Sequence, residues 1–314
     1  MSAKISSWLC AGGALAALVL ISGSARADIV ERSFDVSPNG KLEIDSDVGS
    51  IEVRSHDANT VEIRVSRLTP RSERLKLDFS MEGSTVRVTG DLPSEHDGGN
   101  YKVQFDVQVP RSFELDLTTA GGSVSVDDLD GQVRAQTAGG SMDFGHMGGP
   151  VWARTAGGSI ELRDSRAEAD LSTAGGSIDV GDVAGEVRAK TAGGSIRIGR
   201  VEGSVDAHTS GGSVHVEEAV GAVRASTSGG SIRAYISQQP NADSELETSG
   251  GQVTVILADN VALDVDANGG DGGVHSDFPI DGRTDSDYSL RGPLNGGGPR
   301  LSLRSSSGVE IRRR

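Results

Sequence analysis

The chain has 314 residues, of which 44 are glycine and one, Cys10, is cysteine. Its formal net charge of −15 argues against nucleic acid or anionic lipid as a partner, because both are bound by clustered lysine and arginine. The glycines lack the one-in-three spacing of collagen, so they indicate either disorder or many tight turns, and the periodicity described below favours turns.

Residues 1–27 are predicted to be a secretory signal peptide. Lys4 precedes an apolar run from Trp8 to Ile21, and the Ala-Arg-Ala sequence at 25–27 matches an A-x-A cleavage site. The run is too short to span a bilayer, and no stop-transfer pattern follows it. We therefore expect cleavage after Ala27, no membrane span or cysteine in the mature chain, and a periplasmic or extracellular location.

Residues 28–118 are predicted to be β-rich but irregular. Alternating segments at Val61–Val65, Thr85–Val88 and Tyr101–Val109 are typical of strands. Val48–Val53 is a degenerate copy of the repeat that follows. We interpret this part as irregular first coils and a cap that blocks an open strand edge.

Residues 119–267 contain an 18-residue repeat. Glycine pairs recur at this spacing and then once more after 21 residues, beginning at Gly121, Gly139, Gly157, Gly175, Gly193, Gly211, Gly229 and Gly250. An unbroken period of this length is typical of a solenoid. The sequence therefore predicts stacked coils, each of which buries its apolar face against its neighbours.

One copy, from Thr173 at position 1 to Lys190 at position 18, shows the pattern. Apolar residues occupy positions 6, 8, 11, 15 and 17. Spacing of two within each run predicts two short strands per coil, each with one face inward. Glycines at positions 3 and 4 are expected to provide positive φ at a corner. The predicted fold is an all-β, single parallel β-solenoid of roughly ten to twelve coils.

Two other solenoids do not fit this pattern. The left-handed hexapeptide helix needs an apolar residue at every sixth position, which the repeat lacks. The calcium β-roll needs G-G-x-G-x-D, and the nearest stretch, Gly269–Val274, has valine where aspartate is required. Calcium-dependent folding is therefore disfavoured, and no cofactor is expected.

Residues 268–314 are predicted to be degenerate coils, a loop around 276–299 and a charged tail. The loop is suggested by Gly296-Gly297-Gly298 between two prolines, and the tail ends in Arg312-Arg313-Arg314.

Three stretches carry a resemblance to a known family. They are Leu42–Val53, the step Val109-Pro110-Arg111 into the repeats, and the recurrent Thr-Ala-Gly-Gly-Ser-Ile. Over nearly the whole mature chain, the sequence resembles the bacterial putative-adhesin family of unknown function with β-strand repeats. The resemblance implies an exported all-β solenoid in the envelope or outside the cell, and it supplies no catalytic residues.

Outward carboxylates are the first candidate site. Asp143, Glu161 and Asp179 share position 7 in successive coils, which places like charges about 4.8 Å apart. The ladder continues with Arg197, His215 and Arg233. A weak divalent-cation site is one interpretation, and a solvated face is the favoured one because nothing closes a coordination shell. A polysaccharide lyase or hydrolase is a third, although these carboxylates are expected to be exposed.

Trp152 is the second candidate. It occupies position 16, which is predicted to face outward, with Arg134 one coil before it and Arg154 two residues after it. The ring could be a platform for a glycan or a protein. The favoured interpretation is a surface cation–π pair with Arg134.

The sequence as a whole predicts a non-enzymatic exported scaffold, similar to an adhesin, with an unknown protein or glycan partner and no catalytic or metal-binding residue. A carbohydrate-active enzyme on the same fold and a self-associating structural module are the alternatives.

Overall fold

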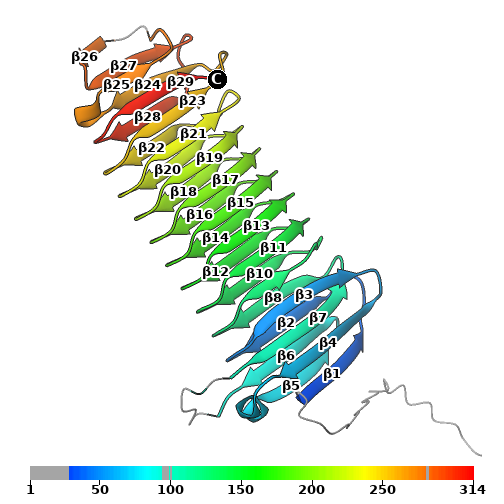
Figure 1. The fold of residues 1–314 in the computed structure, drawn as a ribbon. Helices are drawn as coiled ribbons and strands as arrows, with labels where there is room; N and C mark the ends of the chain where they lie inside the picture. Colours follow the sequence, from blue (N-terminus) through cyan, green and yellow to red (C-terminus); the bar gives the residue numbers. More distant parts are fainter. Residues whose placement is uncertain (1–27, 94–98, 100, 281–282) are drawn as a thin grey trace, which may run out of the picture.

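The computed structural model describes residues 28–93, 99, 101–280 and 283–314, so the predicted signal peptide lies outside the described residues. The described chain is all-β and consists of two long sheets, A and B, which face each other across one continuous core (Figure 1). The predicted all-β solenoid is confirmed. No helix among the described residues is long and apolar enough to cross a membrane.

Each sheet runs the length of the solenoid. In spatial order, sheet A contains β1 (Asp28–Asp35), β4 (Thr60–Arg67), β7 (Val103–Pro110), β3 (Ser50–His56), β9 (Val124–Val126), β11 (Met142–Met147), β13 (Ile160–Ser165), β15 (Ile178–Val183), β17 (Ile196–Val201), β19 (Val214–Ala219), β21 (Ile232–Ile236), β23 (Val253–Leu257), β29 (Val309–Arg313) and β25 (Val274–Ser276). Sheet B contains β26 (Arg283–Ser286), β27 (Ser289–Leu294), β24 (Leu263–Asn268), β28 (Arg300–Ser305), β22 (Ser244–Thr248), β20 (Val223–Thr227), β18 (Val205–Thr209), β16 (Val187–Thr191), β14 (Ala169–Thr173), β12 (Val151–Thr155), β10 (Val133–Thr137), β8 (Glu114–Thr119), β2 (Lys41–Ser46), β6 (Thr85–Asp91) and β5 (Lys76–Glu82). Two short 3₁₀ turns, η1 (Pro70–Arg74) and η2 (Gly270–Gly272), complete the elements.

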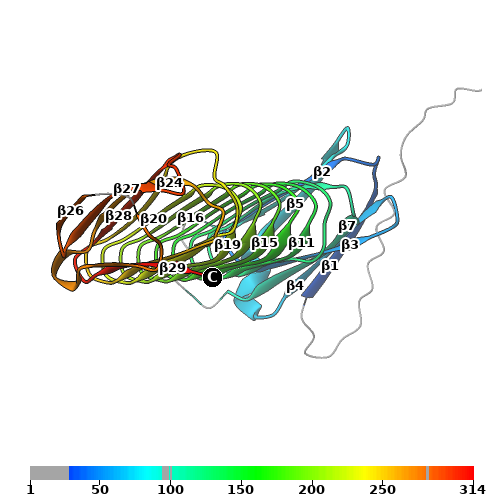
Figure 2. The same ribbon diagram turned by 90° about the horizontal axis from the view of Figure 1, so that it is seen from above.

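The regular coils follow the repeat. Each coil contributes one strand to each sheet, and neighbouring coils pair in parallel with a register of 18 residues, as in Val187 beside Val205. Ile178 and Val180 at positions 6 and 8 are buried, as are Val187 and Ala189 at positions 15 and 17. Seen along its length, this part is a flattened tube of stacked coils (Figure 2). The predicted inward positions are therefore confirmed.

A buried threonine closes one corner of each regular coil. The Thr191 hydroxyl donates to the carbonyl of Gly176 in the preceding coil at 2.7 Å and accepts from the N–H of Gly194 at 3.3 Å. The same two bonds recur at Thr137, Thr155, Thr173, Thr209, Thr227 and Thr248. Each hydroxyl thereby satisfies two backbone groups that a turn would otherwise leave unpaired.

The position-4 glycines serve a different purpose from the one that the sequence suggested. From Gly140 to Gly251, none of them has φ in the left-handed region, so the expectation of positive φ is wrong for these coils. Instead, a Cβ atom on Gly140 would lie 2.0 Å from the carbonyl oxygen of Gly122. Glycine is required because stacked corners bring one backbone against the next.

The N-terminal coils are not stacked in chain order. The β2–β3 coil lies between the β8–β9 coil and the later β6–β7 coil. β1, β4 and β5 extend both sheets outward as antiparallel strands, because β1 pairs with β4, β4 with β7, and β5 with β6. These antiparallel strands, rather than further coils, form the end of the solenoid (Figure 1).

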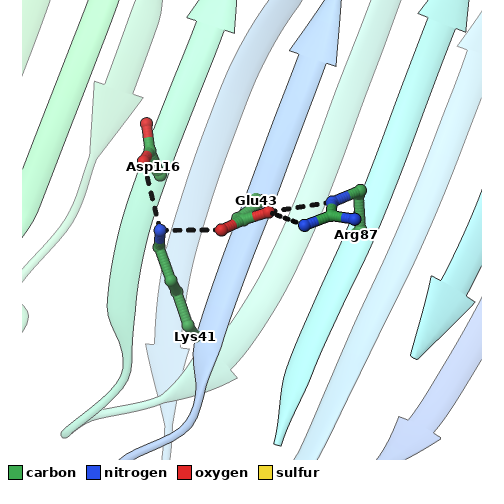
Figure 3. A network of polar contacts seen from close by, with 4 residues as sticks. All are labelled: Lys41, Glu43, Arg87 and Asp116. Carbon is green, nitrogen blue, oxygen red and sulfur yellow. Dashed lines mark hydrogen bonds and ion pairs between the residues drawn. The ribbon is translucent and has the colours of Figure 1, made fainter. Parts of the chain in front are cut away.

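A polar network ties the inserted β2 strand to both neighbours (Figure 3). Glu43 accepts from Lys41 at 2.7 Å and from Arg87 on β6 at 2.9 Å, and Lys41 reaches Asp116 on β8 at 3.2 Å. Hydrogen bonds from Lys41 and then Arg87 hold the pKa of Glu43 below its usual value. The network therefore favours the order β6–β2–β8 through charge-assisted hydrogen bonds.

The C-terminal end is also out of chain order. The β28–β29 coil lies between the β22–β23 coil and the earlier β24–β25 coil. The prediction of a charged tail is thus wrong, because Leu301, Leu303, Val309 and Ile311 are fully buried. The predicted loop at 276–299 contains the β26–β27 hairpin. With these end coils, the described residues form twelve two-strand coils, within the expected number.

Candidate binding faces

The six candidate residues lie on the outer surfaces of two opposed sheets. Asp143, Glu161 and Asp179 are on β11, β13 and β15 of sheet A. On sheet B, Arg134 lies on β10, whereas Trp152 and Arg154 lie on β12. Because the core separates the two sheets, the structure does not bring these two groups together into one site.

The carboxylate ladder on sheet A is arranged as the repeat suggested. Asp143, Glu161 and Asp179 are neighbours in register, and all three are exposed. Asp179 accepts a hydrogen bond from Arg197 of the next coil at 3.2 Å. Among the residues that the structure describes, no group of three or more His, Cys, Asp or Glu side chains is arranged to hold a metal ion.

The Trp152 ring is half-buried and paired with a cation. Arg134, its register partner on β10, places its guanidinium 5.3 Å from the ring centroid. Arg154 is exposed and lies between Gln136 and Ser172 in the neighbouring coils. The cation–π pair favoured from the sequence is present, and it occupies part of the ring surface that a ligand would use.

A hollow on the N-terminal part of sheet A was not foreseen from the sequence. It has a volume of about 750 Å³ and is lined mainly by outward side chains of β1, β3, β4 and β7. Its charged residues are of both signs, with Glu31 and Arg64 3.5 Å apart and Glu52 paired with Arg54. The hollow depends on the antiparallel extension of the sheet, and the local sequence carries no signal for that pairing.

A nearly buried carboxylate on sheet B was also missed. Asp266 on β24 accepts hydrogen bonds from Arg291 of β27, at 2.9 Å, and from Arg300 of β28, while Arg304 lies 4.0 Å away. Burial alone would raise the pKa of Asp266, but the bonds from Arg300 and Arg291 outweigh burial and hold its pKa below the ordinary value. This cluster joins the displaced β24 strand to its two neighbours.

Asp266→Asn should destabilise the chain by about 1–3 kcal/mol at neutral pH, because it removes a charged acceptor from nearly buried hydrogen bonds. The folded pKa of Asp266 is lowered, so its contribution is present above the unfolded value of about 3.8 and is lost as pH falls through the folded pKa. Urea unfolding of both proteins between pH 7 and 3 should show the two stabilities converging at the acid end.

Asp264→Asn is the matched control for this substitution. Asp264 lies on the same strand two residues away and is exposed. We expect a change of at most about 0.5 kcal/mol with little pH dependence, as for other surface changes. Equal effects of the two substitutions would contradict the role assigned to Asp266.

Solved structures with related shapes share little sequence identity with the chain. A "putative lipid binding protein" from Parabacteroides distasonis is 16% identical, with a TM-score of 0.39 over 90% of this chain and 96% of that chain. A "putative adhesin" from Parabacteroides merdae is 11% identical, with a TM-score of 0.36 over 90% and 95%. A "putative cell adhesion protein" from Clostridium sporogenes is 8% identical, with a TM-score of 0.23 over 91% and 100%. Similarity at this level carries no information on function.

The family comparison is more informative than these structures. No curated protein matches the chain. The family model described as Toastrack DUF4097 matches residues 39–311, which include every regular coil and, except for the last two residues of β29, both coils that lie out of chain order. The chain therefore belongs to the Toastrack DUF4097 family.

Proposed function

We propose that the chain is a non-enzymatic, exported cell-envelope protein that binds a protein or glycan partner through its outer strand faces, as an adhesin does. One observation carries the proposal. The repeated residues are used in stacking: valine, isoleucine and alanine in the core, threonine and glycine at the corners. The side chains that vary between coils are displayed outward on two long faces, where a partner can contact them.

The signal-peptide pattern of residues 1–27 supports export. The strongly negative net charge supports a partner other than nucleic acid. A polysaccharide lyase or hydrolase is the alternative from a different class. Such enzymes need a pair of carboxyl groups at a defined separation, one of them commonly buried to serve as the acid. The exposure of Asp143, Glu161 and Asp179 favours a binding role over this alternative.

Cell fractionation tests the export part of the proposal. The tagged full chain, expressed in a bacterial host, should appear in the periplasmic, envelope or medium fraction with its N-terminus at Asp28. Retention of the uncleaved chain in the cytoplasm would refute it. Substituting Lys for Leu18 and Leu20 within the apolar run provides a control that should block export.

A glycan array tests the proposed binding of a partner, and an assay on acidic polysaccharides tests the proposed lack of enzymatic activity. We expect binding without chain cleavage, and Trp152→Ala would show whether the ring takes part. Cleavage that is lost in Asp143→Asn or Glu161→Gln would instead establish an enzyme.

A further inference from the structure

The outer face of sheet A separates its charges into two blocks. At position 7, three acidic residues are followed along the solenoid by three basic or neutral ones: Asp143, Glu161, Asp179, Arg197, His215 and Arg233. These six residues lie on consecutive strands from β11 to β21. All but the half-buried His215 are exposed. The face is therefore acidic at one end and basic at the other.

This order is unfavourable within a single molecule. Like charges directly opposite each other on neighbouring strands are destabilising, and the acidic block contains two such contacts, Asp143 with Glu161 and Glu161 with Asp179. Sheet B does not have this order. Its position 16 alternates through Asp170, Arg188, Asp206 and Arg224, so unlike charges stack beside each other within one chain. The stacking of coils alone thus does not require blocks.

We propose that this face of sheet A binds the same face of a second copy of the chain, with the two solenoid axes antiparallel. The two-fold axis would run along the strands between β15 and β17. It would place Asp143 opposite Arg233, Glu161 opposite His215, and Asp179 opposite Arg197 of the second copy. Each contact occurs twice, as a closed two-fold dimer requires. Asp143 and Asp179 would each face an arginine, and Glu161 would face the imidazole of His215.

Position 9, the next outward position, fits the same axis. Its residues from β11 to β19 are Gly145, Arg163, Gly181, Gly199 and Glu217. The rotation places Arg163 opposite Glu217 and Gly181 opposite Gly199. On β21 the register shifts and Tyr235 is buried, and Arg314 lies over its ring at 4.4 Å and adds a cation to the basic end. The charges at position 9 are therefore complementary about the same axis as those at position 7.

The margin of the face, at position 10, is mixed. Asp182 would face Arg200, which is favourable, whereas Asp164 would face Glu218. Glu218 already pairs with Arg200 of its own chain at 2.7 Å, and Asp164 contacts the imidazole of His146. The pairing of Glu218 with Arg200 reduces the repulsion between Asp164 and Glu218.

The expected dimer is weak and sensitive to salt. Six strands of about five residues cover roughly 500 Å² per copy, which is less than the ~800 Å² of a standard interface. Ion pairs at such an interface are screened at high ionic strength. This proposal is independent of the proposed function, because the dimer is argued from the charges on sheet A and requires no other protein or glycan.

Charge exchange provides the decisive test. Sedimentation equilibrium of the chain from residue 28 should show a monomer–dimer equilibrium. Asp143→Arg or Arg233→Asp alone should weaken it at least about tenfold, because like charges then meet. The double variant should restore it. The two residues are five coils, about 24 Å, apart in one chain, so a direct contact within the monomer cannot account for the restoration.

Lys190→Asp on sheet B is the control. It makes the same type of charge change at an exposed position and should leave the equilibrium unchanged. Thermal melts would establish that each variant is folded. A wild-type chain that stays monomeric up to about 1 mM, where even weak association is measurable, would overturn the proposal. So would a dimer that the single variants do not weaken or that the double variant does not restore.

Discussion

Gly140→Ala should destabilise the solenoid by about 3 kcal/mol or more, an effect larger than most single substitutions cause. The added Cβ would lie 2.0 Å from the Gly122 carbonyl oxygen, 2.3 Å from its carbon and 2.5 Å from the Ser123 nitrogen. These are backbone atoms in a neighbouring coil, so no side chain can rotate away. The corner at Gly140 must therefore move away from the corner of the preceding coil, and this movement also strains the hydrogen bond from the Gly140 N–H to the Thr137 hydroxyl. Equilibrium denaturation in urea would measure the loss.

The adjacent Gly139 is a matched control. A Cβ there would meet no atom within 4 Å, and neither glycine has φ in the left-handed region. Gly139→Ala should therefore change stability by less than about 1 kcal/mol, and restriction of the unfolded chain could make it slightly stabilising. Similar losses at the two positions would mean that backbone freedom, rather than close approach, explains the glycine pairs.

The sequence was informative where the controlling interactions repeat. Alternation such as Ile178-x-Val180 reports directly which side chains point inward, and an 18-residue period reports which residues stack. The outward placement of Asp143 and Trp152 followed from the same positions. The role of Gly140 could not be predicted from its position in the repeat. A positive φ is the usual local reason for glycine, whereas Gly140 is required by close approach to a backbone segment 18 residues away.

The ends could not be predicted in the same way. Val61–Val65 was recognisable as a strand, but its antiparallel partners in β1 and β7 are not encoded in its own pattern. The hollow on sheet A and the arginine cluster at Asp266 both depend on such pairings. Near the C-terminus, glycines, prolines and arginines obscured the alternation of Leu301 with Leu303 and of Val309 with Ile311.

Truncation after Pro299 should unfold the C-terminal end of the solenoid. It removes β28 and β29, which lie between the β22–β23 coil and the β24–β25 coil, so neither coil keeps its partner on that side. Coils in a solenoid are stabilised mainly by their nearest neighbours. Amide hydrogen exchange should therefore lose protection from β24 to β27 and retain it from β12 to β19. A true tail could be removed without either effect.

A point substitution separates this effect from the loss of chain length. Ile311 on β29 is fully buried, and Ile311→Asp places a charge in the core, which should destabilise the end coils by several kcal/mol, on the order of 3–5. Arg312→Gln, one residue away and exposed, removes only a surface ion pair with Glu310 and should cost less than about 1 kcal/mol. Because adjacent strand residues face opposite ways, only a segment built into the sheet can distinguish the two substitutions. Equal exchange protection of the end coils in the two variants would mean that residues 300–314 are a tail and not part of the sheets. The coils that stack in chain order would then end with the β22–β23 coil.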